Sequence, residues 1–310
     1  MKVLVTGATG IVGGWLVKAL VDRGDSVACL VRDEVPRSIF HALGLDRRVA
    51  TVRGALEDAD TVMRAFNEYE VEVVYHLGAQ AIVGVGNRHP VSTFEANIKG
   101  SWNVLEAARQ HKPLRKLVYA TSDKAYGDLP TLPYTEDMPL RGSHPYDVSK
   151  SCADLLGQCY LATYKLPVAI VRCGNIYGGG DLNFNRIIPG TIRSVLEGQR
   201  PVVRSDGTPL RDYLHVQDAV SAYLVLGASP ATGAFNFGTE RPTSVIDLVR
   251  LILVLMKSKL RPEVRNEASN EIAQQWLSSK KARETLGWKP ELDLKRGLVE
   301  TIAWYRKHFK

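Results

Sequence analysis

The chain has 310 residues, of which 45% are hydrophobic and 24% are charged, values close to the average for globular proteins. This composition excludes a disordered or fibrous protein, and the length allows one large domain or two unequal domains with a full hydrophobic core. The formal net charge is +7, but the excess of basic residues after Glu240 includes no basic run or RNA-binding motif, so we expect no nucleic-acid partner.

The start of the chain and its cysteines bear on location. The sequence opens with a strand-like segment and has neither a signal-peptide pattern nor the run of about 20 apolar residues that a membrane span needs. Its four cysteines show no CxxC spacing and no neighbouring histidine cluster, so we expect neither disulfides nor a metal site. We therefore expect a cytoplasmic protein that has no membrane partner.

Short β-branched segments alternate with longer amphipathic segments in the first part of the chain. The predicted strands are residues 3–6, 26–31, 49–53, 73–77, 116–121 and 168–172. The predicted helices are residues 12–23, 60–68, 91–110 and 146–164, where apolar residues recur every three or four positions. Because the strands are almost continuously apolar, we predict an α/β fold with a doubly wound parallel Rossmann sheet that helices cover on both faces.

The regular alternation weakens after residue 172. Glycine-rich sequence is followed by helix-like segments at residues 187–199, 244–256, 278–286 and 295–308. We predict a dinucleotide-binding domain at residues 1–172 and a smaller α/β substrate-binding lobe at residues 173–310. Residues 212–238 are expected to return to the first domain.

Three glycines follow the first predicted strand with GxxGxxG spacing. Such glycines allow a tight turn, a close approach of the backbone to a pyrophosphate, and a helix N-terminus that faces this anion. The strand before them and the amphipathic helix after them favour a cofactor loop over a purely structural turn. The residues expected to contact the cofactor here are Gly7, Thr9, Gly10, Ile11, Val12 and Gly13.

The end of the second predicted strand bears on the choice of cofactor. Val31 stands where NAD enzymes usually carry an acidic residue that bonds the ribose 2′-OH. Arg32 could accept the 2′-phosphate of NADP or be only a surface charge, whereas Asp33 could still reach the ribose of NAD. We predict NAD and leave NADP open.

Tyr146 and Lys150 form a YxxxK pair at the start of a predicted helix. Residues four apart lie on one helix face, and a neighbouring cation favours the phenolate, so we expect Lys150 to lower the pKa of Tyr146. The segment that ends in TSDKAYG precedes this pair and follows the strand at residues 116–121. Its end lies at the carboxyl edge of the predicted sheet, where ligands bind in open α/β folds.

These motifs carry a resemblance that spans the chain. TGATGIVG, HLGAQ (76–80), TSDKAYG (121–127), YDVSK (146–150) and GNIYGGG (174–180) resemble the nucleotide-sugar epimerase and dehydratase group of the extended short-chain dehydrogenase/reductase superfamily. Within that group, the chain is most similar to the CDP-glucose 4,6-dehydratases. The resemblance implies a nucleotide-diphosphosugar substrate, NAD, and a homodimer formed through the helices at residues 91–110 and 146–164.

The resemblance also implies roles for single residues. Ser122 would bond the sugar O4, Tyr146 would take the 4-OH proton, and Lys150 would hold the nicotinamide ribose. Asp123 and Lys124 would eliminate water across C5 and C6, for which Lys124 as a base must be neutral. The further cofactor contacts implied are Arg32, Asp33, Ala55, Leu56, Leu77, Gly78, Ala79, Gln80 and Asn97. The substrate contacts implied are Asn175, Arg186, Arg211 and Arg265, of which Arg186 and Arg265 could also be surface charges.

Three functions stay open. The Asp123–Lys124 pair favours a 4,6-dehydratase, which needs an acid and a base to eliminate water. The alternative is that the two residues form only an ion pair at the surface. A nucleotide-sugar 4-epimerase of the UDP-sugar type shares the Ser, Tyr and Lys but usually has small or apolar residues after the Ser. In its favour, GTPLRDYLHV (207–216) resembles the epimerases and the dTDP-sugar enzymes. A non-catalytic protein that senses NAD(P) could also use this fold, but it would not need the Ser, Tyr and Lys set.

Overall fold

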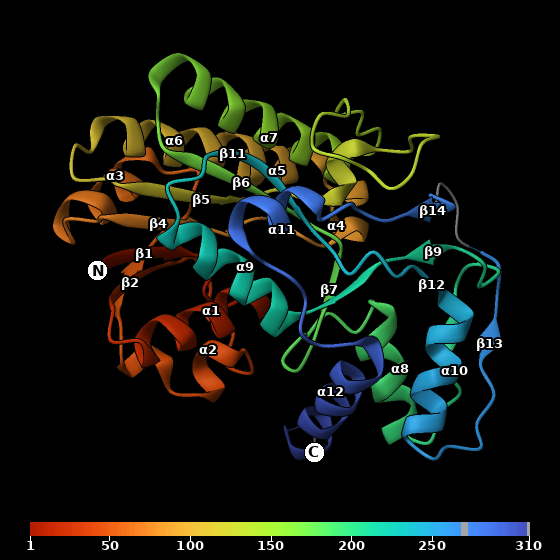
Figure 1. The fold of residues 1–310 in the computed structure, drawn as a ribbon. Helices are drawn as coiled ribbons and strands as arrows, with labels where there is room; N and C mark the ends of the chain where they lie inside the picture. Colours follow the sequence, from red (N-terminus) through yellow and green to blue (C-terminus); the bar gives the residue numbers. More distant parts are fainter. Residues whose placement is uncertain (268–271, 309–310) are drawn as a thin grey trace.

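The computed structural model describes residues 1–267 and 272–308 of the chain. Its centre is a seven-stranded parallel sheet with the strand order β11-β6-β5-β4-β1-β2-β3 (Figure 1). The strands are β1 (Lys2–Thr6), β2 (Ser26–Val31), β3 (Ala50–Arg53), β4 (Val73–His76), β5 (Lys116–Ala120), β6 (Val168–Cys173) and β11 (Gly233–Phe237). The six strands predicted from the sequence lie within one residue of their predicted ends, and the α/β prediction is confirmed.

Helices cover both faces of the sheet. On one face lie α1 (Ile11–Asp22) and α9 (Val216–Ala228), and on the other lie α3 (Ala59–Glu68), α6 (Gly100–Gln110) and α7 (Pro145–Tyr164). Successive residues of a strand point to opposite faces, so in β1 Val3 and Val5 pack toward α1, whereas Leu4 packs toward α3 and α6. Two buried cores result, one on each side of the strands.

One predicted helix is interrupted. Residues 91–110 were expected to form a single helix, but the structure has α5 (Pro90–Phe94), a π-helical segment (Glu95–Lys99) and then α6. The prediction of a continuous helix is therefore wrong over five residues. Amphipathic spacing does not distinguish one wide turn from an α-helical turn, whereas π-helical turns are often found at functional sites.

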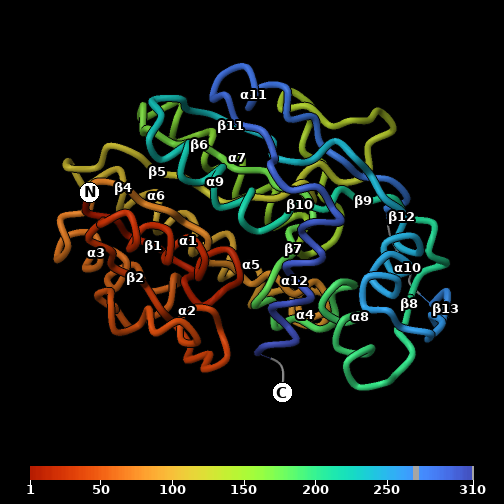
Figure 2. Tube along the Cα trace, turned by 60° about the horizontal axis from the view of Figure 1, so that its bottom comes forward, coloured from red at the N-terminus to blue at the C-terminus, as the bar shows by residue number. Residues whose placement is uncertain are grey.

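The later part of the chain forms a lobe at the right of the sheet in Figures 1 and 2. Its core joins α8 (Ile187–Leu196), α10 (Val245–Leu255) and α12 (Leu294–His308) through buried aliphatic and aromatic side chains. Its short strands are β7 (Asn175–Tyr177), β8 (Val202–Val203), β9 (Leu210–Arg211), β10 (Tyr213–His215), β12 (Thr243–Ser244), β13 (Glu263–Val264) and β14 (Gln274–Gln275). The remaining helices are α2 (Ile39–Ala42), α4 (Val83–Arg88), α11 (Lys280–Leu286) and 3₁₀ helices at Leu45–Arg47 and Asp123–Tyr126. In the described ranges, no helix is long and apolar enough to cross a membrane.

The strand order reverses between β1 and β4, which are direct neighbours although β2 and β3 lie between them in the sequence. Ligands of doubly wound sheets bind outside the carboxyl ends of the strands at such a point. The loops that follow β1 and β4 are in close contact there, since a Cβ at Gly7 would lie 2.7 Å from the backbone nitrogen of Gly78. This edge of the sheet is the place to look for a site.

Candidate active site

The glycine loop after β1 has the form that a dinucleotide pyrophosphate requires. Gly7 has a φ of +77°, which favours glycine, and a Cβ at Gly13 would lie 2.0 Å from the carbonyl oxygen of Gly7. Gly10 is the N-cap of α1, and within the described chain no side chain caps this helix and no acidic residue lies in its first turn. The first N–H groups of α1 and its positive end are therefore left for an anion, and the loop fits NAD.

The loop after β4 is held by two polar side chains that the sequence analysis did not select. Thr6 Oγ1 accepts a hydrogen bond from the Gly78 N–H at 2.9 Å and lies 2.8 Å from Nδ1 of His76. Burial lowers the pKa of His76 to about 3, so its ring is neutral. Thr6 and His76 are register partners at the ends of β1 and β4, and polar residues at the ends of two apolar strands are the signal that could have found them.

Asn97 lies in the π-helical segment and ties the same loop to α7. Its Oδ1 accepts from the Gln80 N–H at 2.7 Å, and its Nδ2 donates to the Gln80 carbonyl at 3.0 Å and to Ser149 Oγ at 2.9 Å. The Ser149 hydroxyl in turn donates to the Tyr146 carbonyl at 2.7 Å. Asn97 thus joins the predicted cofactor loop to the helix that carries the YxxxK pair.

The predicted contacts near the adenosine end are more open. Arg32 Nε donates to Asp33 Oδ2 at 2.7 Å, and their side chains are 57% and 61% exposed. The two residues follow β2 directly. Leu56 follows β3, and its carbonyl accepts from Asn103 Nδ2 at 2.9 Å, whereas its side chain lies beside Gly78. Ala55 precedes Leu56 in the same loop.

Tyr146 and Lys150 lie in the first turns of α7, as predicted, and the Tyr146 hydroxyl is hydrogen-bonded to Ser122. Ser122 follows β5 and is the N-cap of the 3₁₀ helix Asp123–Tyr126. Lys150 Nζ donates to the Ala120 carbonyl at 3.2 Å and lies 6.0 Å from the centre of the Tyr146 ring. The fold therefore brings together the three residues that the sequence singled out for proton transfer at a sugar hydroxyl.

The acidity of this pair differs from the expectation. Burial raises the pKa of Tyr146 to about 12, and the charge of Arg186 and the hydrogen bond to Ser122 oppose this rise only in part. The Lys150 amine donates to the Ala120 carbonyl, and the net pKa shift of Tyr146 is upward. Burial lowers the pKa of Lys150 itself to about 8, against the charge of Asp154. The Tyr146 pKa therefore lies above its ordinary value, because burial outweighs the lowering that was expected from a neighbouring cation.

Asp123 and Lys124 form an ion pair that is not a surface pair. Lys124 Nζ lies 3.1 Å from Asp123 Oδ2, and the side chain of Lys124 is 20% exposed and that of Asp123 4%. Ser122 Oγ donates to the other carboxylate oxygen of Asp123 at 3.0 Å. Gln275 from β14 also contacts the pair, because its Oε1 accepts from Lys124 Nζ and its Nε2 donates to the Asp123 carbonyl. No motif in the sequence points to Gln275, which lies 151 positions from Lys124.

The predicted substrate residues occupy different surroundings. Asn175 opens β7, and among the residues that the structure describes its buried Nδ2 has no hydrogen-bond partner, so it can donate to a ligand. Arg186 is the N-cap of α8 and forms an ion pair with Asp181 at 3.0 Å. Its positive charge also lowers the pKa of Tyr146. Arg211 in β9 is buried and donates to the carbonyls of residues 210, 272 and 273. Arg265 forms an exposed pair with Glu263 on β13.

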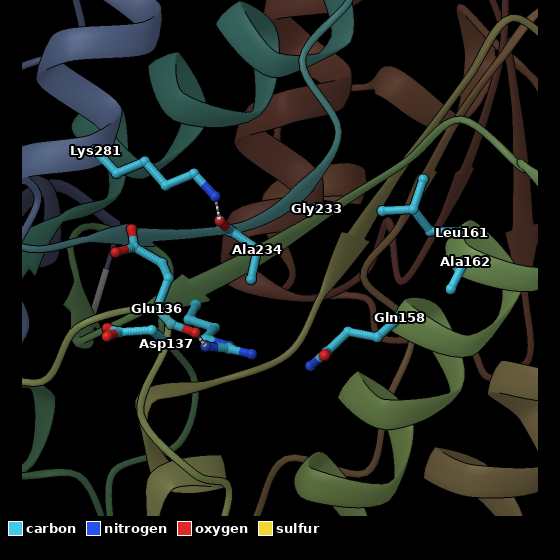
Figure 3. Close-up of a pocket in the computed structure, with 9 residues that line it drawn as sticks. Glu136, Asp137, Gln158, Leu161, Ala162, Gly233, Ala234 and Lys281 are labelled. Carbon is cyan, nitrogen blue, oxygen red and sulfur yellow. Dashed lines mark hydrogen bonds between the residues drawn. The ribbon is translucent and has the colours of Figure 1, made fainter.

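A buried ion pair joins α7 to β6. Arg172 in β6 donates to both carboxylate oxygens of Asp154 in α7, each at 2.7 Å, and Thr121 Oγ1 also donates to Asp154 at 2.9 Å. A separate pocket of about 520 Å³ lies at the β11 edge of the sheet, and Arg172 is one of its lining residues. Figure 3 shows Glu136, Asp137, Gln158 and Lys281 around it. None of the residues assigned above to cofactor, substrate or catalysis lines this pocket.

Comparisons with known proteins agree with this arrangement. The chain is 29% identical over 327 residues to the CDP-glucose 4,6-dehydratase of Salmonella typhimurium, covering 98% of this chain and 90% of the relative. It is 30% identical over 315 residues to the UDP-glucose 4-epimerase of Mycolicibacterium smegmatis, covering 99% of each chain. Relatives with either reaction are therefore about equally similar.

Solved structures give the same picture. A Thermotoga maritima UDP-glucose 4-epimerase determined with UDP-glucose matches 100% of both chains with a TM-score of 0.93 and 27% identity. A Streptomyces venezuelae dTDP-glucose 4,6-dehydratase determined with NAD matches 99% of this chain and 97% of the other, with a TM-score of 0.91 and 25% identity. The sequence pattern of one family matches residues 3–238. The chain belongs to the NAD dependent epimerase/dehydratase family, within the extended short-chain dehydrogenase/reductases.

Proposed function

We propose that the protein is a nucleotide-diphosphosugar 4,6-dehydratase that resembles the CDP-glucose enzymes and forms a 4-keto-6-deoxy sugar. The observation that carries this proposal is the buried Asp123–Lys124 pair directly beside Ser122, which bonds the Tyr146 hydroxyl. Oxidation at C4 alone would not require a carboxyl and an amine next to the Ser. Elimination of water requires an acid and a base together.

The first half of the reaction uses Ser122, Tyr146 and Lys150. Ser122 holds the sugar O4, and Tyr146 takes the 4-OH proton as the C4–H bond breaks. Bound NAD supplies the chemistry of accepting a hydride from C4 and giving it back at C6. Burial leaves Tyr146 with a pKa of about 12, so this proton transfer needs a nearby positive charge, which the cofactor and Lys150 provide when the site is filled.

The second half uses the Asp123–Lys124 pair. The C4 ketone acidifies the C5 proton, Lys124 takes that proton, and Asp123 gives a proton to the C6 hydroxyl, which leaves as water while a C5–C6 double bond forms. Lys124 must begin neutral and Asp123 protonated. The passage of one proton along the 3.1 Å contact between them produces this state from the ion pair without any change in total charge.

The binding roles belong to the same proposal. The residues proposed for NAD are Gly7, Thr9, Gly10, Ile11, Val12, Gly13, Arg32, Asp33, Ala55, Leu56, Leu77, Gly78, Ala79, Gln80, Asn97, Tyr146 and Lys150. The residues proposed for the nucleotide diphosphate and the sugar are Asn175, Arg186, Arg211 and Arg265. The unpartnered amide nitrogen of Asn175 is the strongest support among these, since a buried donor without an acceptor is costly.

The similarity to UDP-glucose 4-epimerases favours a 4-epimerase as the second candidate function. Both reactions begin with oxidation at C4, and they differ in whether water is then lost. An epimerase would use Ser122, Tyr146 and Lys150 but would leave the Asp123–Lys124 pair without a chemical role. The pair therefore separates the two candidates.

The test is incubation of the protein and NAD or NADP with CDP-glucose, dTDP-glucose, UDP-glucose, UDP-N-acetylglucosamine and GDP-mannose, followed by mass spectrometry and NMR of the sugar. We expect a product that is lighter by one water from CDP-glucose. Lys124→Met and Asp123→Asn are expected to stop water loss and to spare C4 oxidation. A product of unchanged mass with inverted C4 would replace the dehydratase by the epimerase.

We also propose that the chain forms a homodimer through α5, α6 and α7. Large apolar side chains are exposed on these helices, namely Val91 at 70%, Trp102 at 44%, Leu155 at 55% and Tyr164 at 51%. An apolar surface of this kind is typical of an interface.

The four cysteines are unpaired, which supports a reducing compartment such as the cytoplasm.

A further inference from the structure

Gln275 is a buried polar residue that reaches the proposed elimination pair from the second lobe. Its side chain is fully buried in β14, whereas its neighbour Gln274 is exposed. All three of its polar contacts go to one small region: Oε1 accepts from Lys124 Nζ, and Nε2 donates to the carbonyls of Asp123 at 3.1 Å and Gly127 at 3.5 Å. No other part of the second lobe is seen to bond the Lys124 amine among the described residues.

The orientation of Gln275 is fixed by β9 and by the carbonyls it binds. β14 pairs in parallel with β9, and Gln275 is the register partner of Arg211. Arg211 donates to the carbonyl of Ile272 at 2.5 Å and to that of Ala273 at 3.4 Å, just before β14. Because both amide donors of Gln275 face carbonyl oxygens, its own oxygen must face Lys124.

The contacts leave the Lys124 nitrogen with one free direction. An ammonium group has three N–H bonds, and here one is directed to Gln275 Oε1 and one to Asp123 Oδ2. Loss of a proton to Asp123 leaves the lone pair directed at that carboxyl. Rotation of the neutral amine by one third of a turn about the Cε–Nζ bond, with its N–H groups again directed to Gln275 Oε1 and Asp123, brings the lone pair to the remaining position. A base acts only when that lone pair is aligned with the proton it takes, and a misplacement of about 1 Å can cost roughly 100-fold in rate.

We propose that Gln275 is a positioning residue for the elimination step, holding the Lys124 amine so that its free position faces the C5 proton of the sugar. The inference rests on the proposed dehydratase function, because an epimerase has no step for Lys124. Within the described chain, the hydrogen bonds of the Gln275 side chain go to Lys124, Asp123 and Gly127 and not to Ser122, Tyr146 or Lys150, so we expect its main effect on the elimination step rather than on C4 oxidation.

The test separates the two steps in a single turnover. Wild type, Gln275→Met and the matched control Gln274→Met are mixed with NAD and CDP-glucose in D₂O. Absorbance of the reduced cofactor reports C4 oxidation, whereas deuterium at C5 and loss of water from the sugar report elimination. For Gln275→Met we expect oxidation within about 3-fold of wild type, elimination slower by about 10- to 100-fold, and accumulation of reduced cofactor. Gln274→Met is expected to behave as wild type.

A double variant tests whether Gln275 acts through Lys124. If it does, Gln275→Met has no further effect on elimination when Lys124 is already Met. Gln275→Asn retains the amide but shortens its reach, and it carries the same test if Gln275→Met does not fold. If Gln275→Met slows oxidation and elimination by the same factor, or slows neither, the inference is overturned and Gln275 is only a link between the lobes. Failure of the wild type to release water from any substrate would instead refute the dehydratase itself.

Discussion

Replacement of Asp154 by Asn should destabilise the fold strongly. Asp154 is completely buried, and Arg172 is 1% exposed. Burial alone would lower the pKa of Arg172, but the hydrogen bonds and charge of Asp154 raise it, so the guanidinium is charged and depends on this carboxylate. In Asp154→Asn an amide group replaces one of the two oxygens that Arg172 contacts at 2.7 Å, and the charge loses its counterion.

Removal of one partner of a buried pair costs about 3–5 kcal/mol. At about 2–4 °C for each kcal/mol, the melting temperature should fall by roughly 10 °C. Urea unfolding followed by circular dichroism measures the free energy directly, provided that the slope with urea is unchanged. Asp154→Leu combined with Arg172→Met removes both charges and should recover at least half of the loss.

The control is an exposed pair. Lys280 and Glu284 lie 3.9 Å apart with side chains 72% and 65% exposed, so Glu284→Gln should change the free energy of unfolding by less than about 0.5 kcal/mol. A loss below about 1 kcal/mol in Asp154→Asn would refute the reasoning, because it would mean that Arg172 finds another counterion or water.

Three further predictions follow from the site and its surroundings. Burial lowers the pKa of Lys150 from 10.5 to about 8, so the charged amine destabilises the fold at pH 7, and this cost fades as the pH rises from about 8 to 10.5. Lys150→Met should therefore raise the free energy of unfolding by up to about 3 kcal/mol at pH 7 while abolishing turnover. A gain in stability that does not shrink toward pH 10 would contradict this. Gly13→Ala should abolish NAD binding in calorimetry, because its Cβ would lie 2.0 Å from the Gly7 carbonyl oxygen. The control Gly24→Ala has nothing within 4 Å of its Cβ but is strained by a φ of +89°, so it should lose stability and still bind NAD. Leu155→Glu should convert the proposed dimer to a monomer in light scattering, and Val254→Glu on α10, which is 71% exposed, should not; a dimer that survives Leu155→Glu would place the interface elsewhere.

The sequence sufficed where local chemistry decides the structure. Apolar strands, amphipathic helices and the GxxGxxG spacing are local patterns, and the six strands and the positions of Tyr146 and Lys150 followed from them. The sequence did not suffice where the structure joins distant segments. Gln275 meets Lys124 across 151 positions, and the Thr6–His76 contact spans 70. The sequence around Gln275 contains no sign of its contact with Lys124, whereas the polar ends of two apolar strands are a weak sign of the Thr6–His76 contact.

The pKa values of the site residues were the second property that the sequence alone did not predict. The spacing of Tyr146 and Lys150 predicted a direct effect of the amine on the phenol, but the depth of burial outweighs it in the protein without cofactor. Burial depends on how β5, α7 and the second lobe pack together. It therefore becomes known only with the tertiary structure, as does the shielding of Asp123 that distinguishes the Asp123–Lys124 pair from a surface ion pair.

The π-helical segment lets two stretches of one long helix follow separate registers. One extra residue in a helix turns everything before it by about 100° relative to everything after it. α6 can thus keep its apolar side on the sheet while Asn97 faces Gln80 and Ser149. Deletion of one residue from Glu95–Lys99 would give a more regular helix, yet it would rotate α5 and Asn97 away from their partners. The wide turn therefore lets Asn97 face the loop after β4 without changing how α6 packs on the sheet.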